Sequence, residues 1–461
     1  MLGILPIVLT LFLLMYFAYR GYSVLILAPI MAALAVILTG DVIASLPAYT
    51  TVFMTAFSNF LLKFFPVFLL GALFGKLMAD SGAATSIAEF VVKKLDKDKA
   101  ILAVVLICGI LTYGGVSLFV VAFAIYPIAK DLFAKADVPK RLIPAAIALG
   151  SFTFTMTALP GTPAIQNAIP IPYYGTNVFA APILGIIGGL IMFVGGVWWL
   201  NTRAKLAHKK GEGYGTHHDG TDNPVAHSRM NFGMAMIPLV LVIGVNALLT
   251  YVVFPSMDFA FLQDKFADLN IKGSLGLWSI IISLTVACAV LVLMQLKHWQ
   301  NLQRTLNSGA NDSMLPVFNV ASEVGYGAVI ASLAGFVLIR DGILNLSPNN
   351  PLISEAVAMT TLAGITGSSS GGLSIALATL GKEYLEMANA AGISPELMHR
   401  VATMAAGGLD TLPHSGAVVT LLAICSMTHK QSYLNLAAVT IVIPLIATIV
   451  VIALGTLFGS F

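Results

Sequence analysis

Four short polar segments interrupt long hydrophobic stretches of this sequence, at residues 112–117, 157–167, 367–374 and 410–415. Each combines glycine or proline with hydroxyl or amide side chains. Such a segment breaks a helix and leaves backbone N–H groups free at one end and carbonyl groups free at the other. Free N–H groups attract carboxylates and free carbonyl groups attract cations. Together the segments predict a binding site for a small anion and a coupling ion.

The side chains and glycines of these segments are the candidate substrate contacts. We expect them to be Thr112, Gly114, Gly115, Ser117, Thr157, Gly161, Thr162, Gln166, Asn167, Ser368, Ser369, Ser370, Gly371, Ser374, Thr411, His414 and Ser415. For any single segment a structural role is the alternative, because glycine pairs allow close helix packing and hydroxyl groups bond to their own backbone. Four segments at matched places in the chain favour a functional site.

Three ionisable residues lie in otherwise apolar sequence: Glu323, Asp410 and His414. A charge at the centre of a bilayer is costly, so these side chains are expected to line a cavity or to change protonation. His414 titrates closest to physiological pH, and Asp410 could hold a proton or bind a sodium ion. A structural hydrogen bond is an equal alternative for Glu323. We predict that cation coupling depends on these three residues.

The four segments contain no arginine or lysine. Helix dipoles, hydroxyl groups and His414 would therefore neutralise an anionic substrate, which favours a monocarboxylate over a polyanion such as citrate. The sequence has no phosphate-binding loop and no nucleophile elbow, and its three cysteines lack metal or disulfide spacing. It predicts no catalytic residues, no metal and no cofactor.

The elements that carry these segments belong to a membrane protein. Of 461 residues, 58% are hydrophobic and 10% are charged, with a mean hydropathy of +0.91. A soluble protein carries roughly a quarter charged residues, so most of this surface must face a lipid bilayer. The net charge of +3 is small and dispersed, and it gives no indication of nucleic-acid binding.

The hydrophobic stretches predict an all-α polytopic protein with about ten transmembrane helices, because each crossing needs about 20 apolar residues. Two further stretches, at about 100–129 and 353–380, contain the glycine-rich segments. The charges on both sides of each stretch predict that it returns to the side from which it enters. We expect two re-entrant hairpins, whose turns are tolerated only where protein or water surrounds them.

The two halves of the chain resemble each other. Three motifs recur in the same order: Phe/Leu-Pro-Val-Phe (65–68 and 315–318), Gly-Gly (114–115 and 371–372) and Leu-Pro (159–160 and 412–413). We infer a first half at 1–200, a cytoplasmic linker at 201–230 and a second half at 231–461. Histidines in the linker allow a metal-sensing role, but the composition favours a hydrophilic linker.

Positive charges predict the orientation of the halves. The linker holds five Lys or Arg residues, and the segments 93–99 and 130–141 hold four each, whereas their second-half partners, 340–350 and 382–400, hold one and two. The first hairpin is therefore expected to open to the cytoplasm and the second to the outside. Such inverted-topology repeats are typical of transporters.

Several stretches resemble the gluconate permease (GntP-type) family of the ion transporter superfamily, across nearly the whole chain outside the linker. They are FPVFLLGALFGKLM, TYGGVSLFVV, TALPGTPAIQNAIP, ASEVGYGAVI, GITGSSSGGLSIAL and GGLDTLPHSGAVVTLL. The resemblance implies proton-coupled uptake of small organic anions, a bacterial inner membrane, and a homodimeric scaffold against which a transport domain slides. It places the family's hairpin tips at 112–117 and 367–374, and its helix breaks at 157–163 and 410–415.

The first break lacks the histidine of gluconate transporters, and the sequence looks closer to 3-hydroxybutyrate permeases. The tips also lack the superfamily's usual asparagines, which disfavours sodium coupling. We predict a proton symporter of a small hydroxycarboxylate, with 3-hydroxybutyrate favoured. A symporter of gluconate, another sugar acid or a dicarboxylate, with sodium as a possible coupling ion, is the alternative. A channel or an intramembrane enzyme is the least favoured.

Overall fold

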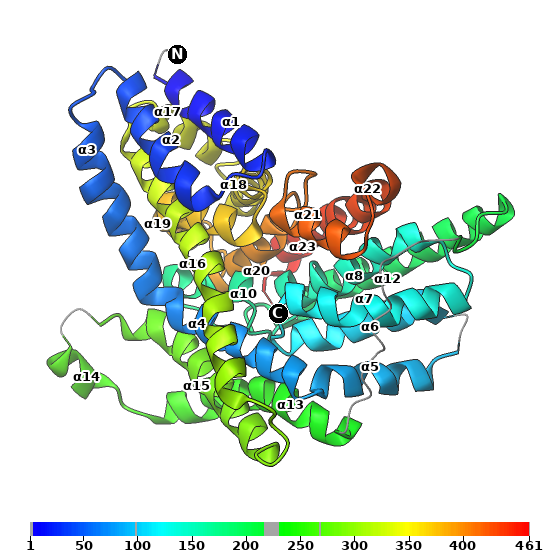
Figure 1. The fold of residues 1–461 in the computed structure, drawn as a ribbon. Helices are drawn as coiled ribbons and strands as arrows, with labels where there is room; N and C mark the ends of the chain where they lie inside the picture. Colours follow the sequence, from blue (N-terminus) through cyan, green and yellow to red (C-terminus); the bar gives the residue numbers. More distant parts are fainter. Residues whose placement is uncertain (1–2, 97–98, 216–229, 267–268, 461) are drawn as a thin grey trace.

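The computed structural model describes residues 3–96, 99–215, 230–266 and 269–460 (Figure 1), and in these ranges it contains helices and no strands. Six of the described helical stretches are long and apolar enough to cross a membrane, and four shorter helices are also apolar. The predicted all-helical fold is therefore confirmed. The count of ten crossings stays a prediction.

The first half contains α1 (Leu5–Tyr19), α2 (Val24–Leu38), α3 (Ser45–Pro47), η1 (Ala48–Phe53), α4 (Met54–Asp80), α5 (Ala83–Lys94), α6 (Ala100–Tyr113), α7 (Leu118–Lys135), η3 (Lys140–Leu142), α8 (Ile143–Ser151), α9 (Phe154–Thr157), α10 (Ile165–Ala168), α11 (Ile171–Tyr174) and α12 (Pro182–Lys209). The second half contains α13 (Phe232–Leu248), η4 (Leu249–Val253), η5 (Phe254–Ser256), α14 (Ala260–Lys265), α15 (Ile271–Met294), α16 (Leu302–Ser332), α17 (Phe336–Leu344), α18 (Pro351–Thr366), α19 (Ser369–Ala390), α20 (Pro395–Ala406), α21 (Gly416–Ile424), α22 (His429–Ala437), η6 (Ala438–Val442) and α23 (Ile443–Phe458).

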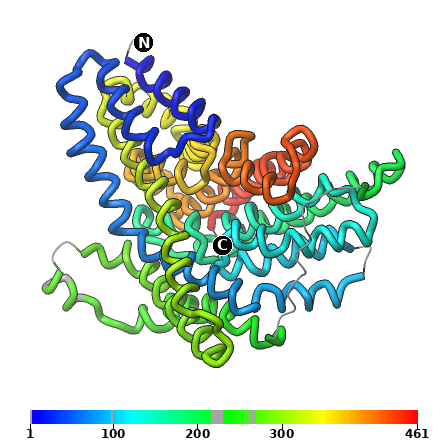
Figure 2. The backbone as a smooth tube through the Cα atoms, viewed as in Figure 1, coloured from blue at the N-terminus to red at the C-terminus, as the bar shows by residue number. Residues whose placement is uncertain are grey.

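The long helices α4 and α16 pack against each other along the centre of the molecule (Figures 1 and 2). Each contains an internal proline, Pro66 in α4 and Pro316 in α16. Gly309 lets the two backbones approach closely, because a Cβ atom there would lie 3.1 Å from the Cα atom of Leu73. The helices that carry the repeated Pro-Val-Phe motif thus support each other.

Each glycine-rich segment forms the turn of a packed helix pair, α6 with α7 and α18 with α19. Gly115 and Gly367 turn the chain with φ of +100° and +65°, which favours glycine. In the second pair the two helices touch so closely that a Cβ atom on Gly372 would overlap the backbone of Ala363. The helix–turn–helix units are therefore present, and their re-entry into the membrane stays a prediction.

Both Leu-Pro motifs interrupt helices. No helix covers the chain between α9 and α10 or between α20 and α21, because proline cannot continue a helix and restricts the residue before it. The order of elements is consequently the same in both halves: a long helix, a helix pair, a broken helix and a second long helix. The predicted opposite orientation of the halves stays a prediction.

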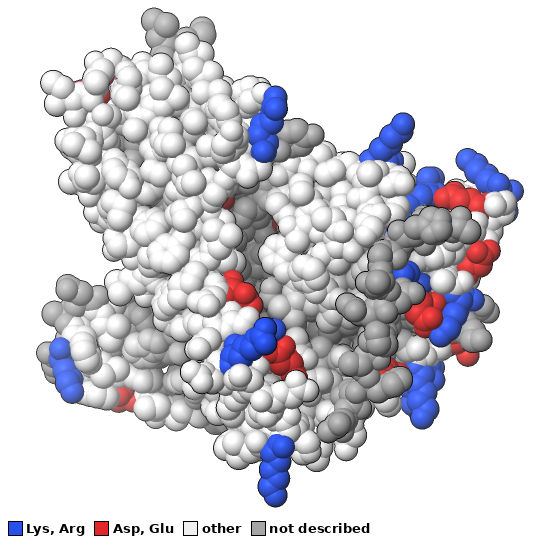
Figure 3. Space-filling view, in the orientation of Figure 1, with Lys and Arg blue, Asp and Glu red and all other residues white. Residues whose placement is uncertain are grey.

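Most charged side chains on the face shown in Figure 3 lie at one edge, over the ends of α5, α7 and α12, while the lobe that carries α1 and α2 is nearly uncharged. Two cations that the orientation argument placed in loops are instead buried. Lys140 is 2% exposed and lies over the ring of Tyr126, and Arg400 is 0% exposed inside α20. The predicted difference in positive charge between the loops at 130–141 and 382–400 therefore rests on fewer exposed cations than a count of their Lys and Arg residues gives.

The hydrophobic core has two parts. A large cluster joins α4–α8, α12, α13, α15 and α16 to α18–α23, and a smaller one lies between α1, α2, η1 and α16. Outside these cores, large apolar side chains are widely exposed, including Leu62 at 80%, Trp198 at 65% and Ile449 at 65%. An exposed apolar surface on this scale fits lipid contact.

Candidate functional site

The first tip lies on the first helix break. The hydroxyl of Tyr113, in the tip, donates a 2.7 Å hydrogen bond to the carbonyl of Pro160, in the break. A Cβ atom on Gly115 would lie 2.8 Å from the Cγ atom of Pro163. The packing therefore requires glycine at this position and fixes the tip against the break.

The second tip contacts both breaks. Gln166 Nε2 donates a 2.9 Å hydrogen bond to Ser369 Oγ, and Ser415 Oγ donates a 2.8 Å hydrogen bond to the Gly367 carbonyl. The ring of His414 lies directly beside Gly367, since a Cβ atom on that glycine would lie 3.2 Å from His414 Nε2. These contacts bring all four polar segments into one cluster, although they are far apart in the sequence.

Glu323 joins this cluster from α16. Its carboxylate lies against the second tip so closely that a Cβ atom on Gly371 would overlap Glu323 Oε2. Asp410 lies beside Ser369 of the same tip. The three residues predicted to couple transport to a cation, Glu323, Asp410 and His414, are thus placed around one helix–turn–helix unit.

Buried polar atoms without partners collect in and beside the four segments. Six of the buried polar atoms that have no hydrogen-bond partner among the described residues belong to these segments or contact them: Thr112 Oγ1, Gln166 Oε1, Glu323 Oε2, Ser374 Oγ, Asp410 Oδ1 and His414 Nε2. Each costs about 1–3 kcal/mol while it stays unpaired, so native proteins contain few of them. The group includes both hydrogen-bond donors and acceptors, which are the kinds of atom that a small polar solute would need.

Several predicted contacts already have partners within the protein. Thr157 Oγ1 donates to Thr153 O, Thr162 Oγ1 accepts from Ala164 N, Ser368 Oγ accepts from Gly371 N, and the hydroxyls of Thr411 and Thr440 are 2.7 Å apart. Asn167 Nδ2 donates to the carbonyls of Thr162 and Val178. These bonds stabilise the breaks and the tip, and a role in substrate binding stays a prediction for these residues.

The remaining predicted contacts shape the tips and the first break. Gly114 lies against Leu239 of α13, and Ser117 packs beside Gly75 of α4. Gly161 turns the first break with φ of +86° and contacts Phe179. Ser370 lies at the start of α19, with its hydroxyl 3.3 Å from that of Ser368. Their contribution to a binding site also stays a prediction.

Arg400 is a buried cation that the sequence argument did not place at the site. Its Nε and Nη2 atoms donate to the Ala180 carbonyl at 3.1 and 2.8 Å, and Nη2 also donates to the Val178 carbonyl at 3.4 Å. Nη1 donates to the Thr157 carbonyl at 3.1 Å and to Asn167 Oδ1 at 3.2 Å. No carboxylate among the described residues pairs with this guanidinium group. A full positive charge therefore lies behind the first break.

His399, beside it, is also fully buried. Its Nδ1 and the hydroxyl of Thr176 are 2.6 Å apart, and its Nε2 lies 3.1 Å from Asn167 Oδ1. One feature of the sequence indicated that both residues are buried. They follow a Ser-Pro helix start and are themselves followed directly by the apolar stretch of residues 401–406. A helix that begins there carries them into the membrane domain.

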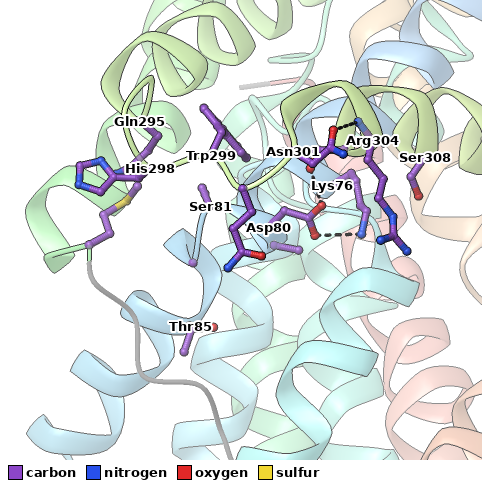
Figure 4. A pocket seen from close by; sticks show the side chains of 15 residues that line it. Lys76, Asp80, Ser81, Thr85, Gln295, His298, Trp299, Asn301, Arg304 and Ser308 are labelled. Atoms are coloured by element: carbon purple, nitrogen blue, oxygen red, sulfur yellow. Dashed lines mark hydrogen bonds and ion pairs between the residues drawn. The ribbon is translucent and has the colours of Figure 1, made fainter.

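A polar hollow lies at the ends of α4, α15 and α16, with a volume of about 680 Å³ (Figure 4). Lys76 and Asp80 form a 2.9 Å ion pair on its wall, and Thr305 Oγ1 donates a 2.7 Å hydrogen bond to Asp80. None of the predicted site residues lines this hollow. It is separate from the cluster formed by the tips and breaks.

Comparison with known proteins gives a consistent result. The model of a family described as GntP family permease matches residues 1–457. An uncharacterized transporter of Bacillus subtilis, YxjC, is 44% identical over 469 residues, which cover 98% of each chain. An uncharacterized transporter of Haemophilus influenzae is 35% identical over 123 residues, or 26% of this chain and 29% of the relative.

Two solved transporter structures share the fold. MtrF of Neisseria gonorrhoeae superposes with a TM-score of 0.55 at 13% identity, covering 90% of this chain and 84% of MtrF. The YdaH transporter of Alcanivorax borkumensis superposes with a TM-score of 0.53 at 16% identity, covering 90% of this chain and 88% of YdaH. At such identities the likeness concerns the fold alone.

Proposed function

We propose, since the chain belongs to the GntP permease family and is therefore a multi-pass membrane transporter rather than an enzyme, that it carries a small hydroxycarboxylate into the cell together with a proton. The favoured substrate is 3-hydroxybutyrate, and the favoured membrane is the inner membrane of a bacterium. The observation that carries the proposal is the cluster of six unpartnered polar atoms where the tips and breaks meet.

The chemistry of these atoms suits a hydroxy acid. The imidazole, hydroxyl and amide groups can bond to both a carboxylate and a hydroxyl group. Apolar residues beside the first break, such as Ile165, offer a surface for a short carbon chain. A substrate that satisfies several of these atoms at once relieves the cost of leaving them unpaired.

The charge near the site favours one carboxylate on the substrate. Arg400 supplies a single positive charge whose hydrogen-bond partners are all neutral carbonyl oxygens. One substrate carboxylate would balance this charge, whereas a dicarboxylate would leave an excess negative charge in a medium of low polarity. The expected contribution of helix dipoles, hydroxyl groups and His414 to neutralising the substrate stays a prediction beside it.

A proton is the favoured coupling ion because ionisable groups surround the second tip. Asp410 Oδ1, Glu323 Oε2 and His414 Nε2 are buried without partners, so each can gain or lose a proton without first breaking a bond at that atom. Sodium remains the alternative ion, and gluconate, another sugar acid or a dicarboxylate the alternative substrate. Each alternative is an outcome of the experiment below.

The transport mechanism is also part of the proposal. We propose a homodimer in which the helix pairs and broken helices of each protomer move against a scaffold. The separate small core between α1, α2, η1 and α16 supports such a division, because a part with its own core can keep its packing while the rest of the protein moves.

Uptake of radiolabelled 3-hydroxybutyrate into proteoliposomes tests the proposal, first under an imposed pH gradient and then under a sodium gradient. Accumulation that follows the pH gradient and is poorly inhibited by gluconate supports it. Accumulation that needs sodium, or strong inhibition by gluconate, favours the alternatives. If correctly folded protein takes up nothing under either gradient, the proposed substrate is wrong.

Asp410→Asn tests the coupling role in the same vesicles. We expect it to abolish accumulation and to leave folding intact, because asparagine keeps the shape of the side chain and cannot hold the proton. Asp341→Asn is the matched control, since Asp341 lies on α17 with a half-exposed side chain and pairs with Arg340. Concentrative uptake by Asp410→Asn would exclude this role for Asp410.

A further inference from the structure

A buried carboxyl group that the site does not use lies in α18. Glu355 is 0% exposed, and the hydroxyl of Tyr174, in α11, donates a short hydrogen bond to its Oε1 atom. Its Oε2 atom is buried and has no partner among the described residues. Glu355 therefore has one oxygen bonded to the first half of the protein and one oxygen free.

The neighbours of Glu355 supply no positive charge. Tyr384 of α19 is the other titratable group close to it, and its hydroxyl donates to the Ser354 carbonyl at 3.2 Å. Glu383 lies next to Tyr384 and adds a negative charge rather than a positive one. Ionised Glu355 would thus be a buried anion without a counterion, which is among the least stable states of a protein side chain.

The other helices packed against α18 do not change this balance. On α20, His399 and Arg400 make their hydrogen bonds with the first break and the adjoining loop. On α17, Arg340 pairs with Asp341 at 2.9 Å. The sequence of α1 contains no Asp, Glu, Lys, Arg or His. Within the described part of the chain, Glu355 makes no ion pair.

We infer that Glu355 is a proton-binding site, distinct from the cluster of Asp410, His414 and Glu323, and this inference rests on the proposed coupling to protons. When the site is exposed to water, a proton from the more acidic side forms an O–H bond at Oε2 and cancels the negative charge. The neutral side chain is then compatible with burial against Tyr174. A metal ion does not suit this place, since no group of three or more Asp, Glu, His or Cys residues gathers in the described ranges.

The location gives the proton a means to act on the transport cycle. Glu355 belongs to a helix of the second helix–turn–helix unit, and it lies on the order of 16 Å along α18 from the end of that helix at Thr366, where the second tip begins. Tyr174 belongs to the segment that follows the first break. The Glu355–Tyr174 contact therefore joins the parts that carry two of the four polar segments. Loss of the proton places an uncompensated charge in that contact and favours its opening and hydration.

Transport by Glu355→Gln tests the inference, because glutamine resembles the protonated carboxyl group and cannot release a proton. We expect the variant to keep exchange of labelled for unlabelled substrate across the membrane and to lose accumulation driven by a pH gradient. Glu386→Gln is the matched control on α19, where the carboxylate is 67% exposed and faces Lys382. The control is expected to accumulate substrate like the wild type.

Infrared difference spectra of the purified protein, recorded across a pH titration, test proton binding without transport. The wild type and Glu386→Gln should show the C=O stretch of a protonated carboxyl group that Glu355→Gln lacks. This measurement separates the inference from the proposed function, because it stays informative if the wild type does not transport 3-hydroxybutyrate or uses sodium.

Two results would overturn the inference: pH-driven accumulation by Glu355→Gln at the wild-type level, or identical carboxyl bands in Glu355→Gln and the wild type. If Glu355→Gln fails to fold, the same infrared measurement on Tyr174→Phe tests whether Glu355 binds the proton. Loss of the tyrosine hydroxyl removes a donor that stabilises the ionised carboxylate, so the carboxyl band should persist to higher pH. An unchanged titration in Tyr174→Phe would contradict the assignment of the site.

Discussion

Gln166 in the first helix break donates a 2.9 Å hydrogen bond to Ser369 in the second tip, across 203 positions of sequence. Both side chains are buried, and the free Oε1 atom of Gln166 faces no other partner among the described residues. One amide group thus joins the two halves of the chain and still offers an acceptor to a substrate.

Gln166→Ala should weaken substrate binding. The substitution removes the acceptor and leaves the Ser369 hydroxyl without its donor, which costs about 1–3 kcal/mol and should raise KM about tenfold. KM for uptake in proteoliposomes measures the effect. Ser369→Ala and the double variant should show that the two effects are not additive, because the residues act as a pair. Gln303→Ala, on the exposed surface of α16, is the control, and a similar KM change there would contradict a specific role.

Gly372→Ala should destabilise the second helix pair. A Cβ atom at this position would overlap the backbone of Ala363, and overpacking of this kind costs about 1–3 kcal/mol or more. Thermal denaturation in detergent should show a lower Tm. The control is Gly342→Ala on α17, where a Cβ atom has no neighbour within 4 Å and alanine should raise Tm slightly. An unchanged Tm for Gly372→Ala would mean that α18 and α19 can separate freely.

Arg400→Gln should destabilise the first break and weaken binding of an anion. The substitution removes the five hydrogen bonds that the guanidinium group donates, and we expect a loss of about 3 kcal/mol in the free energy of unfolding. Arg400→Lys should lose comparable stability, because lysine cannot form the planar fork, but it keeps the charge.

The comparison of these two variants separates charge from structure. If the charge of Arg400 attracts the substrate, Arg400→Lys should bind 3-hydroxybutyrate more tightly than Arg400→Gln at similar Tm, as measured by KM. Arg20→Gln, at the exposed end of α1, should leave Tm and KM near the wild-type values. Equal KM values in the lysine and glutamine variants would limit Arg400 to a structural role.

The ion pair of Arg141 with Glu212 predicts a pH dependence of stability. Arg141 donates hydrogen bonds of 2.5 and 2.9 Å to the carboxylate of Glu212, and these bonds, followed by the charges of Arg141 and nearby cations, hold the pKa of Glu212 below its ordinary value of 4.5. A lowered pKa means that the ion pair stabilises the fold above pH 4.5, and that this stabilisation is lost as the pH falls through the lowered pKa.

Glu212→Gln should therefore be less stable than the wild type at neutral pH and equally stable in acid. The difference is expected to be about 0.5 kcal/mol, because the pair is partly exposed to water. Tm values of both proteins measured from neutral to acidic pH give the result. A difference that does not change over this range would show that Glu212 acts through packing and not through its charge.

The general architecture was predictable because it depends on local and compositional properties of the sequence. A charged fraction of 10% cannot cover a soluble protein, and the resemblance to GntP-type permeases is confirmed by the family match over residues 1–457. The helix breaks at Pro160 and Pro413 follow from the missing N–H group of proline and its steric restrictions. The glycine-rich turns follow from the backbone conformations that only glycine adopts easily.

The polar contacts behind the site were not predictable in the same way. From their positions in the sequence, Arg400 and Lys140 were expected to lie in loops. Only the packed structure shows that carbonyl oxygens surround Arg400 and that an aromatic ring lies against Lys140. Glu355 gives no local signal either, since its partner Tyr174 lies 181 positions away. The sequence shows which side chains are polar, but tertiary packing decides which of them lose contact with water.

The unpaired charge of Arg400 has an electrical consequence. Each elementary charge that crosses a membrane potential of about 100 mV exchanges about 2.3 kcal/mol with the electric field. A conformational change that carries α20 along the membrane normal therefore performs electrical work in the empty protein. A bound monocarboxylate that travels with the arginine lowers the charge of the moving part by one, and one coupling proton raises it by one. The loaded and the empty step should therefore carry the same charge, so membrane voltage should act on both and leave the net accumulation unchanged.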